Sequence, residues 1–317
     1  MHYLYLDVFS GISGDMFLGA LLDLGYPAEK FQAAIEPLNL PLTLEITQVK
    51  RASIQATRVK VNLHQSSSPP RTYAAVKKLI LNSPFSPEVK NKSLAVFENL
   101  FLAEAKVHGV SPEKAHLHEA GADDALVDIL GTCFLLEELG ISDIYSSPLN
   151  LGRGFVETDH GVLPVPPPAV AELLKGIPVY SSGPPEELVT PTGAALIKTL
   201  VKEFMPFPQL KYHRLGYGAG SRNRPDFPNL LRVFLGNKVD FSVEEQIFQI
   251  ETNLDEAPPQ LLGAFLEKAL KLGAREAFLT PVTMKKNRLG TKLTLLVDKK
   301  NLDRLTQAIF EETTTIG

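Results

Sequence analysis

The chain opens with the sequence LYLDVFSGISGD at residues 4–15, an apolar run that leads into a glycine-rich turn. The first six of these residues are typical of a buried strand, and the glycines and serines that follow favour a tight turn. Asp15 then begins an amphipathic helical pattern that ends at Gly25, a residue type common just after a helix. A strand, a turn and a helix in this order predict an α/β layer. Asp7, near the end of the strand, occupies the place where α/β sheets usually carry functional groups.

Further elements follow from periodicity. Ser86 and Pro87 mark the start of a long helix as cap and first helical residue. Residues 144–236 are rich in proline and glycine, which predicts short strands and turns. We expect a hairpin of strands at 42–49 and 57–63, and helices at 72–81, 87–108, 129–139, about 168–175 and about 192–204.

The tail is more regular than the middle of the chain. Its patterns predict a strand at 243–252, a helix at 259–272, strands at 276–282 and 293–297, and a helix at 301–312. This β-α-β-β-α order is a split βαβ unit without its last strand. We therefore predict an α+β protein with a mixed α/β domain at 1–237 and a ferredoxin-like domain at 243–317, the second of which we expect to be incomplete.

Composition excludes several classes of protein. The 317 residues are 44% hydrophobic and carry a net charge of −4, which argues against DNA as the main partner. The single cysteine, Cys133, lies in an apolar helical pattern, excludes an intrachain disulfide and fits a reducing cytosol. No apolar run is long enough to span a membrane, and the N-terminus lacks a basic leader region. We expect a cytoplasmic protein.

The densest chemical signal is HLHEAGADDALVD at residues 116–128. In an extended segment His116 and His118 point to one side, and on a helix Asp124 and Asp128 share one face at a spacing of four. Imidazoles and carboxylates arranged in this way suit a divalent metal such as zinc, nickel, manganese or iron. The alternative is structural: a satisfied His118–Glu119 pair at a helix start, with the aspartates complementing the helix dipole.

Other segments are candidates for binding anions or metals. The turn formed by Ser10, Gly11, Ser13 and Gly14 resembles a phosphate cradle, although Asp15 would repel a bare phosphate and is equally explained as a helix cap. His160 precedes a proline-stiffened segment, which suits either a rigid ligand or an ordinary surface histidine. The remaining candidates are a glycine-rich loop at 215–222 that contains Gly218 and Arg222, and a basic hairpin tip with Lys285, Lys286 and Arg288.

Seven segments together resemble one family, the nickel-insertion proteins of the LarC type. They run in order through the chain: YLDVFSGISGDMFLGALLDLG at 5–25, HLHEAGADDALVDILG at 116–131, HGVLPVPPPAVAELLKGIPVY at 160–180, ELVTPTGAAL at 187–196, GYGAGSR at 216–222, ETNLDEAPPQLLG at 251–263 and MKKNRLG at 284–290. The resemblance implies a nickel chelatase or cyclometallase that inserts Ni²⁺ into pyridinium-3,5-bisthiocarboxylic acid mononucleotide. It also implies dependence on CTP with Mn²⁺ or Mg²⁺, a homo-oligomer, and a recipient apoenzyme of the lactate racemase type.

Taken together with the resemblance, the chemistry of these candidates leads us to expect the following roles. His118 or Glu119 would accept the proton displaced from the pyridinium carbon. The nickel contacts would be His116, His118, Asp124, Asp128 and His160. The Ser10–Asp15 turn and the 216–222 segment, with Gly218 and Arg222, would hold the mononucleotide phosphate. Lys285, Lys286 and Arg288 would hold the CTP phosphates, with Asp255 on the accompanying metal.

Two other functions compete with nickel insertion. A nickel chaperone or storage module would bind the ion without chemistry, but such carriers usually contain a histidine tract, and the seven histidines here are dispersed. A metal-dependent hydrolase would use His116 and His118 to activate water.

Overall fold

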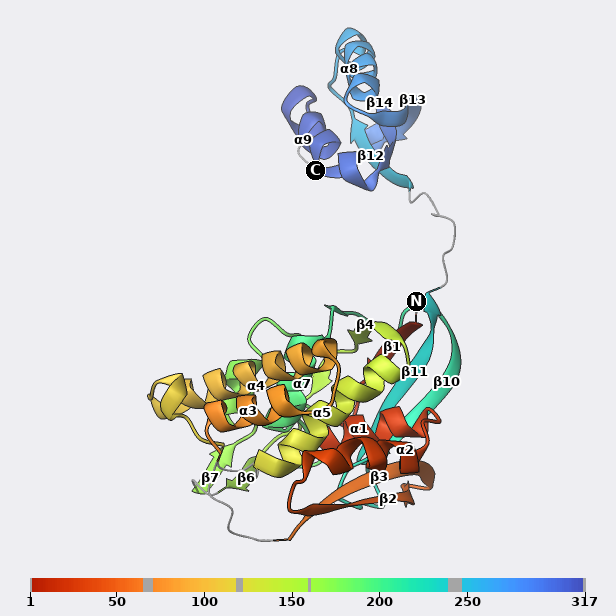
Figure 1. Cartoon of the computed structure of the whole chain (residues 1–317). Helices are drawn as coiled ribbons and strands as arrows, with labels where there is room; N and C mark the ends of the chain where they lie inside the picture. The colour runs from red at the N-terminus through yellow and green to blue at the C-terminus, as the bar shows by residue number, and fades with distance from the viewer. Residues whose placement is uncertain (1, 65–70, 118–121, 159–160, 239–246, 316–317) are drawn as a thin grey trace. The chain divides into compact units, whose positions relative to one another are not determined.

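The computed structural model describes residues 2–64, 71–117, 122–158, 161–238 and 247–315. It divides into two compact units, residues 1–239 and 240–317, which are considered separately (Figure 1). Helices and strands are mixed in both units, so the predicted α+β class is confirmed. No helix of the described residues is long and apolar enough to cross a membrane.

The first unit is built on a seven-stranded mixed sheet of order β2-β3-β10-β11-β1-β4-β9. β1 lies between an antiparallel neighbour, β11, and a parallel one, β4. The strands of this sheet are β1 (His2–Asp7), β2 (Leu42–Arg51), β3 (Ile54–Leu63), β4 (Ile141–Ser146), β9 (Glu203–Phe204), β10 (Leu210–Ala219) and β11 (Leu230–Lys238). Two small pairs accompany it, parallel β5 (Leu149–Asn150) with β8 (Val179–Tyr180) and antiparallel β6 (Phe155–Thr158) with β7 (Gly161–Pro164).

Helices pack in layers against this sheet (Figure 1). α1 contacts β3 and β10 directly, α5 contacts α1 and β4, and α4 packs on α5 and α7. Their buried faces share one apolar core that includes Phe17, Phe97 and Leu126, as well as the buried thiol of Cys133. The helices are α1 (Gly14–Asp23), α2 (Ala28–Ile35), α3 (Tyr73–Asn82), α4 (Pro87–His108), α5 (Ala122–Glu138), α6 (Pro168–Leu173) and α7 (Pro191–Leu200), with 3-10 turns at Glu36–Leu38 and Pro112–Lys114.

Local signals located most of these elements. The Ser86 hydroxyl accepts a hydrogen bond from the Val89 amide at 3.1 Å, as its predicted role of cap requires. Two helix boundaries of the first unit were clearly wrong. α5 begins at Ala122, well before the predicted 129, because its first turn is acidic and not apolar. α7 ends at Leu200, and residues 203–204 instead pair with β4 as β9.

The predicted glycine-rich loop at 215–222 was also wrong, because residues 215–219 belong to β10. A Cβ atom on Gly218 would lie 1.8 Å from the Met16 carbonyl oxygen, and one on Gly216 would lie 2.3 Å from that of Ala20. Both glycines therefore let α1 approach the sheet closely.

The second unit is a three-stranded antiparallel sheet of order β12-β14-β13. Its elements are β12 (Ile247–Leu254), α8 (Pro259–Lys271), β13 (Ala274–Met284), β14 (Arg288–Asp298) and α9 (Leu302–Glu312), with 3-10 turns at Lys285–Asn287 and Lys299–Asn301. Its core gathers around Phe265, Leu295 and Leu305. The third strand lies between the first two, as in a split βαβ unit, and the ferredoxin-like assignment stays a prediction.

Candidate functional site

The turn after β1 is fixed by the segment that precedes α7. The Ile12 amide donates to the Leu188 carbonyl at 2.9 Å, and the Thr190 amide donates to the Ile12 carbonyl at 3.0 Å. Gly11 has φ +76°, and a Cβ atom there would lie 1.9 Å from the Leu188 oxygen, so only glycine fits. These contacts fix the conformation of the turn that leads into the start of α1.

Three carboxylates meet where α1 and α5 begin. Asp15 accepts hydrogen bonds from the Ser13 hydroxyl and, at 2.8 Å, from the Met16 amide. Asp124 accepts one from the Ala125 amide at 2.7 Å. Asp128 Oδ1 is buried and has no hydrogen-bond partner among the described residues. We call Asp15, Asp124 and Asp128 the carboxylate cluster.

The electrostatics of the carboxylate cluster favour the protonated state when no cation is bound. Burial raises the pKa of Asp124 to about 6, and the charges of Asp123 and Asp15 add to this rise. Burial, followed by the charges of Asp15 and Asp124, raises the pKa of Asp128 well above its usual range. The pKa of Asp15 is also raised by burial, although its hydrogen bonds to Ser13 and Met16 oppose the rise. A bound cation would reverse these shifts by favouring the charged forms.

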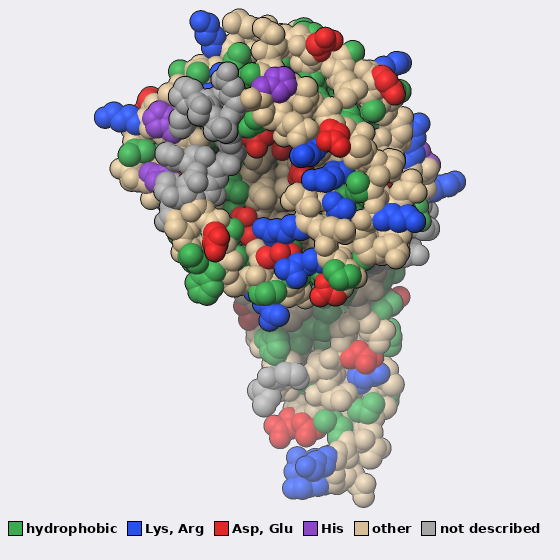
Figure 2. Space-filling model, turned by 90° about the horizontal axis from the view of Figure 1, so that it is seen from below, with side chains coloured by type: hydrophobic (Ala, Val, Ile, Leu, Met, Phe, Trp, Pro, Cys, Tyr) green, Lys and Arg blue, Asp and Glu red, His purple; other side chains and the backbone are tan. Residues whose placement is uncertain are grey.

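The residues of the carboxylate cluster are partly buried. Asp15, Asp124 and Asp128 each keep a part of their surface exposed, although Asp128 Oδ1 itself is inaccessible to solvent. Figure 2 shows that the first unit is hollowed on the face seen there, with acidic and basic side chains around the hollow.

The histidine part of the predicted metal set is only partly described. His116 forms an isolated antiparallel bridge with Thr72. His118, Glu119 and His160 lie outside the described residues. In the part of the chain that is described, no group of three His, Cys, Asp or Glu side chains is placed to hold a metal ion. The described ligands alone therefore do not form a closed metal site.

Other carboxylates of the first unit are neutralised by arginine. Asp123, which is buried, binds Arg71 at 2.7 Å. Asp7, at the end of β1, binds Arg232 Nε at 3.0 Å. These ion pairs give both aspartates a structural role.

Arg222, a predicted phosphate ligand, contacts the segment before α7. Its guanidinium donates to the Glu187 carbonyl at 2.6 Å and lies 3.3 Å from the Glu186 carboxylate, which also binds Arg224. In the turn after β1, the Gly11 amide donates to the Val8 carbonyl at 3.3 Å. Phosphate binding by the Ser10–Asp15 turn, Gly218 and Arg222 stays a prediction.

The basic tip of the second unit joins β13 and β14. Lys286 has φ +63°, and Arg288 lies 3.6 Å from the Asp255 carboxylate at the end of β12. Arg288 and Asp255, predicted as a phosphate ligand and a metal ligand, are therefore neighbours. CTP binding at this tip stays a prediction.

Sequence reasoning missed two arginines of the β2–β3 hairpin. Arg51 is buried, with 5% of its surface exposed, and Arg58 Nε is buried without a hydrogen-bond partner in the described ranges. Each is a single basic residue in an alternating strand pattern. The one available signal was that both fall on the same face of a hairpin.

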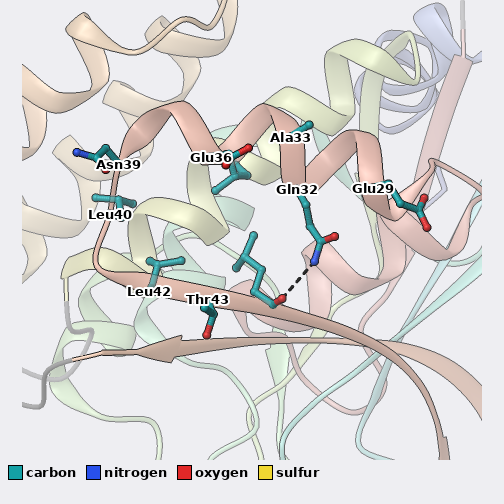
Figure 3. Close-up of a pocket in the computed structure, with 10 residues that line it drawn as sticks. Glu29, Gln32, Ala33, Glu36, Asn39, Leu40, Leu42 and Thr43 are labelled. Atoms are coloured by element: carbon teal, nitrogen blue, oxygen red, sulfur yellow. Dashed lines mark hydrogen bonds between the residues drawn. The ribbon is translucent and has the colours of Figure 1, made fainter.

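A pocket of about 500 Å³ lies elsewhere, between α2 and β2 (Figure 3). It is an open groove in which Gln32 donates to the Leu44 carbonyl at 3.2 Å. It shares no lining residue with the carboxylate cluster. The size of this pocket does not by itself indicate a reaction. We therefore place the candidate site at the carboxylate cluster.

Comparisons with known proteins agree on one family. Residues 4–317 match the family model described as nickel insertion protein. A Geobacillus kaustophilus protein named pyridinium-3,5-bisthiocarboxylic acid mononucleotide nickel insertion protein is 41% identical over 336 residues, which cover 100% of this chain and 82% of the relative. A Dictyoglomus thermophilum relative, whose name also refers to nickel insertion, is 44% identical over 318 residues, with 100% and 82% covered.

One solved structure also matches part of the chain. It is described as LarC2, the C-terminal domain of a cyclometallase involved in the synthesis of the NPN cofactor of lactate racemase. It is 45% identical, and the match covers 22% of this chain and 49% of that one with a TM-score of 0.22.

Proposed function

Because the chain belongs to the nickel insertion protein family, we propose that it inserts nickel into pyridinium-3,5-bisthiocarboxylic acid mononucleotide, the substrate in the name of its Geobacillus relative. The product would be the nickel-pincer cofactor of lactate racemase-type enzymes. The observation that carries the proposal within this chain is the carboxylate cluster, three aspartates whose pKa values are raised and whose charges no described arginine neutralises by an ion pair.

Nickel is a substrate in this reaction, so its site must release it. Carboxylates and imidazoles bind nickel without the closed thiolate ligation that would retain it, and the single cysteine is buried in the core. Asp128 Oδ1 fits a cation because it is enclosed and has no hydrogen-bond partner among the described residues. We propose Asp124 and Asp128 as nickel contacts, with His116, His118 and His160 as further ligands.

The chemistry also needs a proton acceptor. Formation of the carbon–nickel bond breaks a carbon–hydrogen bond of the pyridinium ring, and the released proton must pass to a base. We propose His118 or Glu119 for this role.

The second unit would supply the nucleotide. We propose that Lys285, Lys286 and Arg288 bind the phosphates of CTP and that Asp255 contacts the accompanying Mn²⁺ or Mg²⁺. The support is the contact of Arg288 with Asp255, which puts a cation and a carboxylate at one end of the sheet. A homo-oligomer and a lactate racemase-type apoenzyme as recipient belong to the same proposal.

The test is reconstitution with the whole chain. The protein is incubated with nickel, CTP, Mn²⁺ and the bisthiolated mononucleotide, and formation of the nickel-pincer chromophore is followed by absorbance. We expect product only when all four components are present. Binding of nickel without product would favour a chaperone, and repeated turnover of a phosphoester or amide would favour a hydrolase.

A further inference from the structure

The β2–β3 hairpin carries two arginines on one face. Arg51 pairs with Ile54 across the turn, and Arg58 lies two alternations further along β3 on the same side as Ile54. The guanidinium of Arg51 donates to the Gly220 carbonyl at 2.8 and 3.3 Å and to the Lys50 carbonyl at 3.1 Å. All of its acceptors are neutral, so its charge is buried without a carboxylate.

Arg58 is the more unusual of the two. Its Nε atom is inaccessible to solvent, and in the described part of the chain the side chain has neither a hydrogen bond nor an ion pair. Arg71, Arg224 and Arg232, by contrast, each bind a carboxylate. A partly buried guanidinium without an acceptor is unfavourable, because the lost hydration is not replaced.

The backbone places Arg58 near the start of α1, because its neighbour Thr57 pairs with Gly218 of β10, and Gly218 lies against the Met16 carbonyl of α1. Two electrostatic effects agree with this placement. Burial, and then the charge of Arg58, lowers the pKa of Arg51. Arg58 also counteracts the rise that burial causes in the pKa of Asp15. Asp15 is not the missing acceptor, because it accepts from Ser13 and Met16 and forms no ion pair with Arg58. Two adjacent guanidinium groups instead favour an anion from outside the protein.

We infer that Arg58, supported by Arg51, forms a binding site for a phosphate monoester next to the carboxylate cluster. A planar guanidinium matches two phosphate oxygens, and the neighbouring charge of Arg51 strengthens the attraction. The identity of the ligand rests on the proposed function: a pyridinium mononucleotide has one phosphate at the end away from its ring. With its phosphate bound at Arg58, the mononucleotide could extend its pyridinium ring toward the carboxylate cluster. CTP is the other source of the same chemical group.

The test measures binding and not turnover. Nicotinic acid mononucleotide and its riboside, which lacks only the phosphate, are titrated calorimetrically into the whole chain and into Arg58→Gln. We expect Arg58→Gln to lose about 10- to 100-fold in affinity for the mononucleotide, the range for a hydrogen-bonded charge, and less than twofold for the riboside. Arg58→Lys, which keeps the charge but loses the paired donors, should recover part of the loss.

Lys60→Gln is the matched control. Lys60 is exposed, lies two residues further on the same strand face and carries the same charge, so a purely long-range effect would appear there as well. Equal losses for mononucleotide and riboside, or a loss with Lys60→Gln as large as with Arg58→Gln, would overturn the site.

A parallel titration with CTP distinguishes the two phosphate sources. A loss confined to CTP would keep the phosphate site and assign it to the nucleotide triphosphate. Failure of the proposed function is detected separately, because absence of nickel insertion with intact phosphate-selective binding would remove the reaction and leave the site. Unchanged binding of both phosphate ligands by Arg58→Gln would remove the site and leave the reaction.

Discussion

Two sets of carboxylates in the first unit differ in how their charge is balanced. Asp7 and Asp123 each bind an arginine, and Glu186 binds two. The carboxylate cluster, by contrast, lies at the starts of two helices without an ion pair among the described residues, and its pKa values rise. The paired carboxylates stabilise the fold. The clustered ones cost stability in the folded protein, which is expected of groups that function by binding something else.

The largest expected effect comes from removing a clustered carboxylate. Asp128→Asn should lower the rate of nickel insertion about 100-fold or more, because it deletes a charged contact to the nickel ion. The melting temperature should not fall, since the amide replaces a buried carboxyl group whose charged form is disfavoured by burial. Asp143→Asn, which breaks an exposed pair with Lys202, is the control and should leave the rate unchanged. A rate loss equal to that of the control would contradict the role of Asp128.

Removal of the arginine from a paired carboxylate should lower the stability of the protein more than its rate of nickel insertion. Arg71→Leu leaves the buried Asp123 without its cation and should lower the free energy of unfolding by about 2 kcal/mol, less than for a fully buried pair because Arg71 is partly exposed. Urea denaturation of this variant and of Asp128→Asn measures the difference. If both lose the same stability, the two sets of carboxylates are not distinct.

The smallest effect concerns pH. Since the pKa of Asp124 rises from 3.8 to about 6 on folding, its stabilising contribution is complete below pH 3.8 and is lost as the pH rises through about 6. Nickel binding has the reverse dependence because it requires the carboxylate. Affinity should be about tenfold weaker at pH 5 than at pH 7, measured by competition with a chelator, and Asp124→Asn should flatten the profile. An unchanged slope in that variant would assign the titration to other groups.

Much of the fold was predictable because its signals are local. Ser86 and Pro87 start α4 as their chemistry requires, and the β-α-β-β-α tail follows from hydrophobic periodicity. Gly216 and Gly218 were misread as a loop because the reason for them is a helix that is distant in sequence and crosses β10. That these glycines belong to strand β10 could be recognised only from its contact with α1.

The candidate site was likewise predictable in part, where its signals are local in the sequence. The spacing of Asp124 and Asp128 on one helix could be read from the sequence. Their meeting with Asp15 depends on how α1 packs on α5, which a single segment does not encode. Arg58 had no motif at all, because its significance comes from Arg51, Asp15 and the absence of a described acceptor.

Gly14, the first residue of α1, lies against the Asp128 side chain of α5 and lets these two helices approach each other closely at the carboxylate cluster. A methyl group there would lie 2.3 Å from Asp128 Oδ2, which is too close for a packing contact. The backbone conformation would accept alanine, and a helix would normally prefer it. The absence of a side chain at Gly14 thus leaves the space that the Asp128 carboxylate occupies. Gly14→Ala would force the Asp128 side chain to move while keeping every carboxylate, so the geometry of the carboxylate cluster could be changed without altering the charge of the protein.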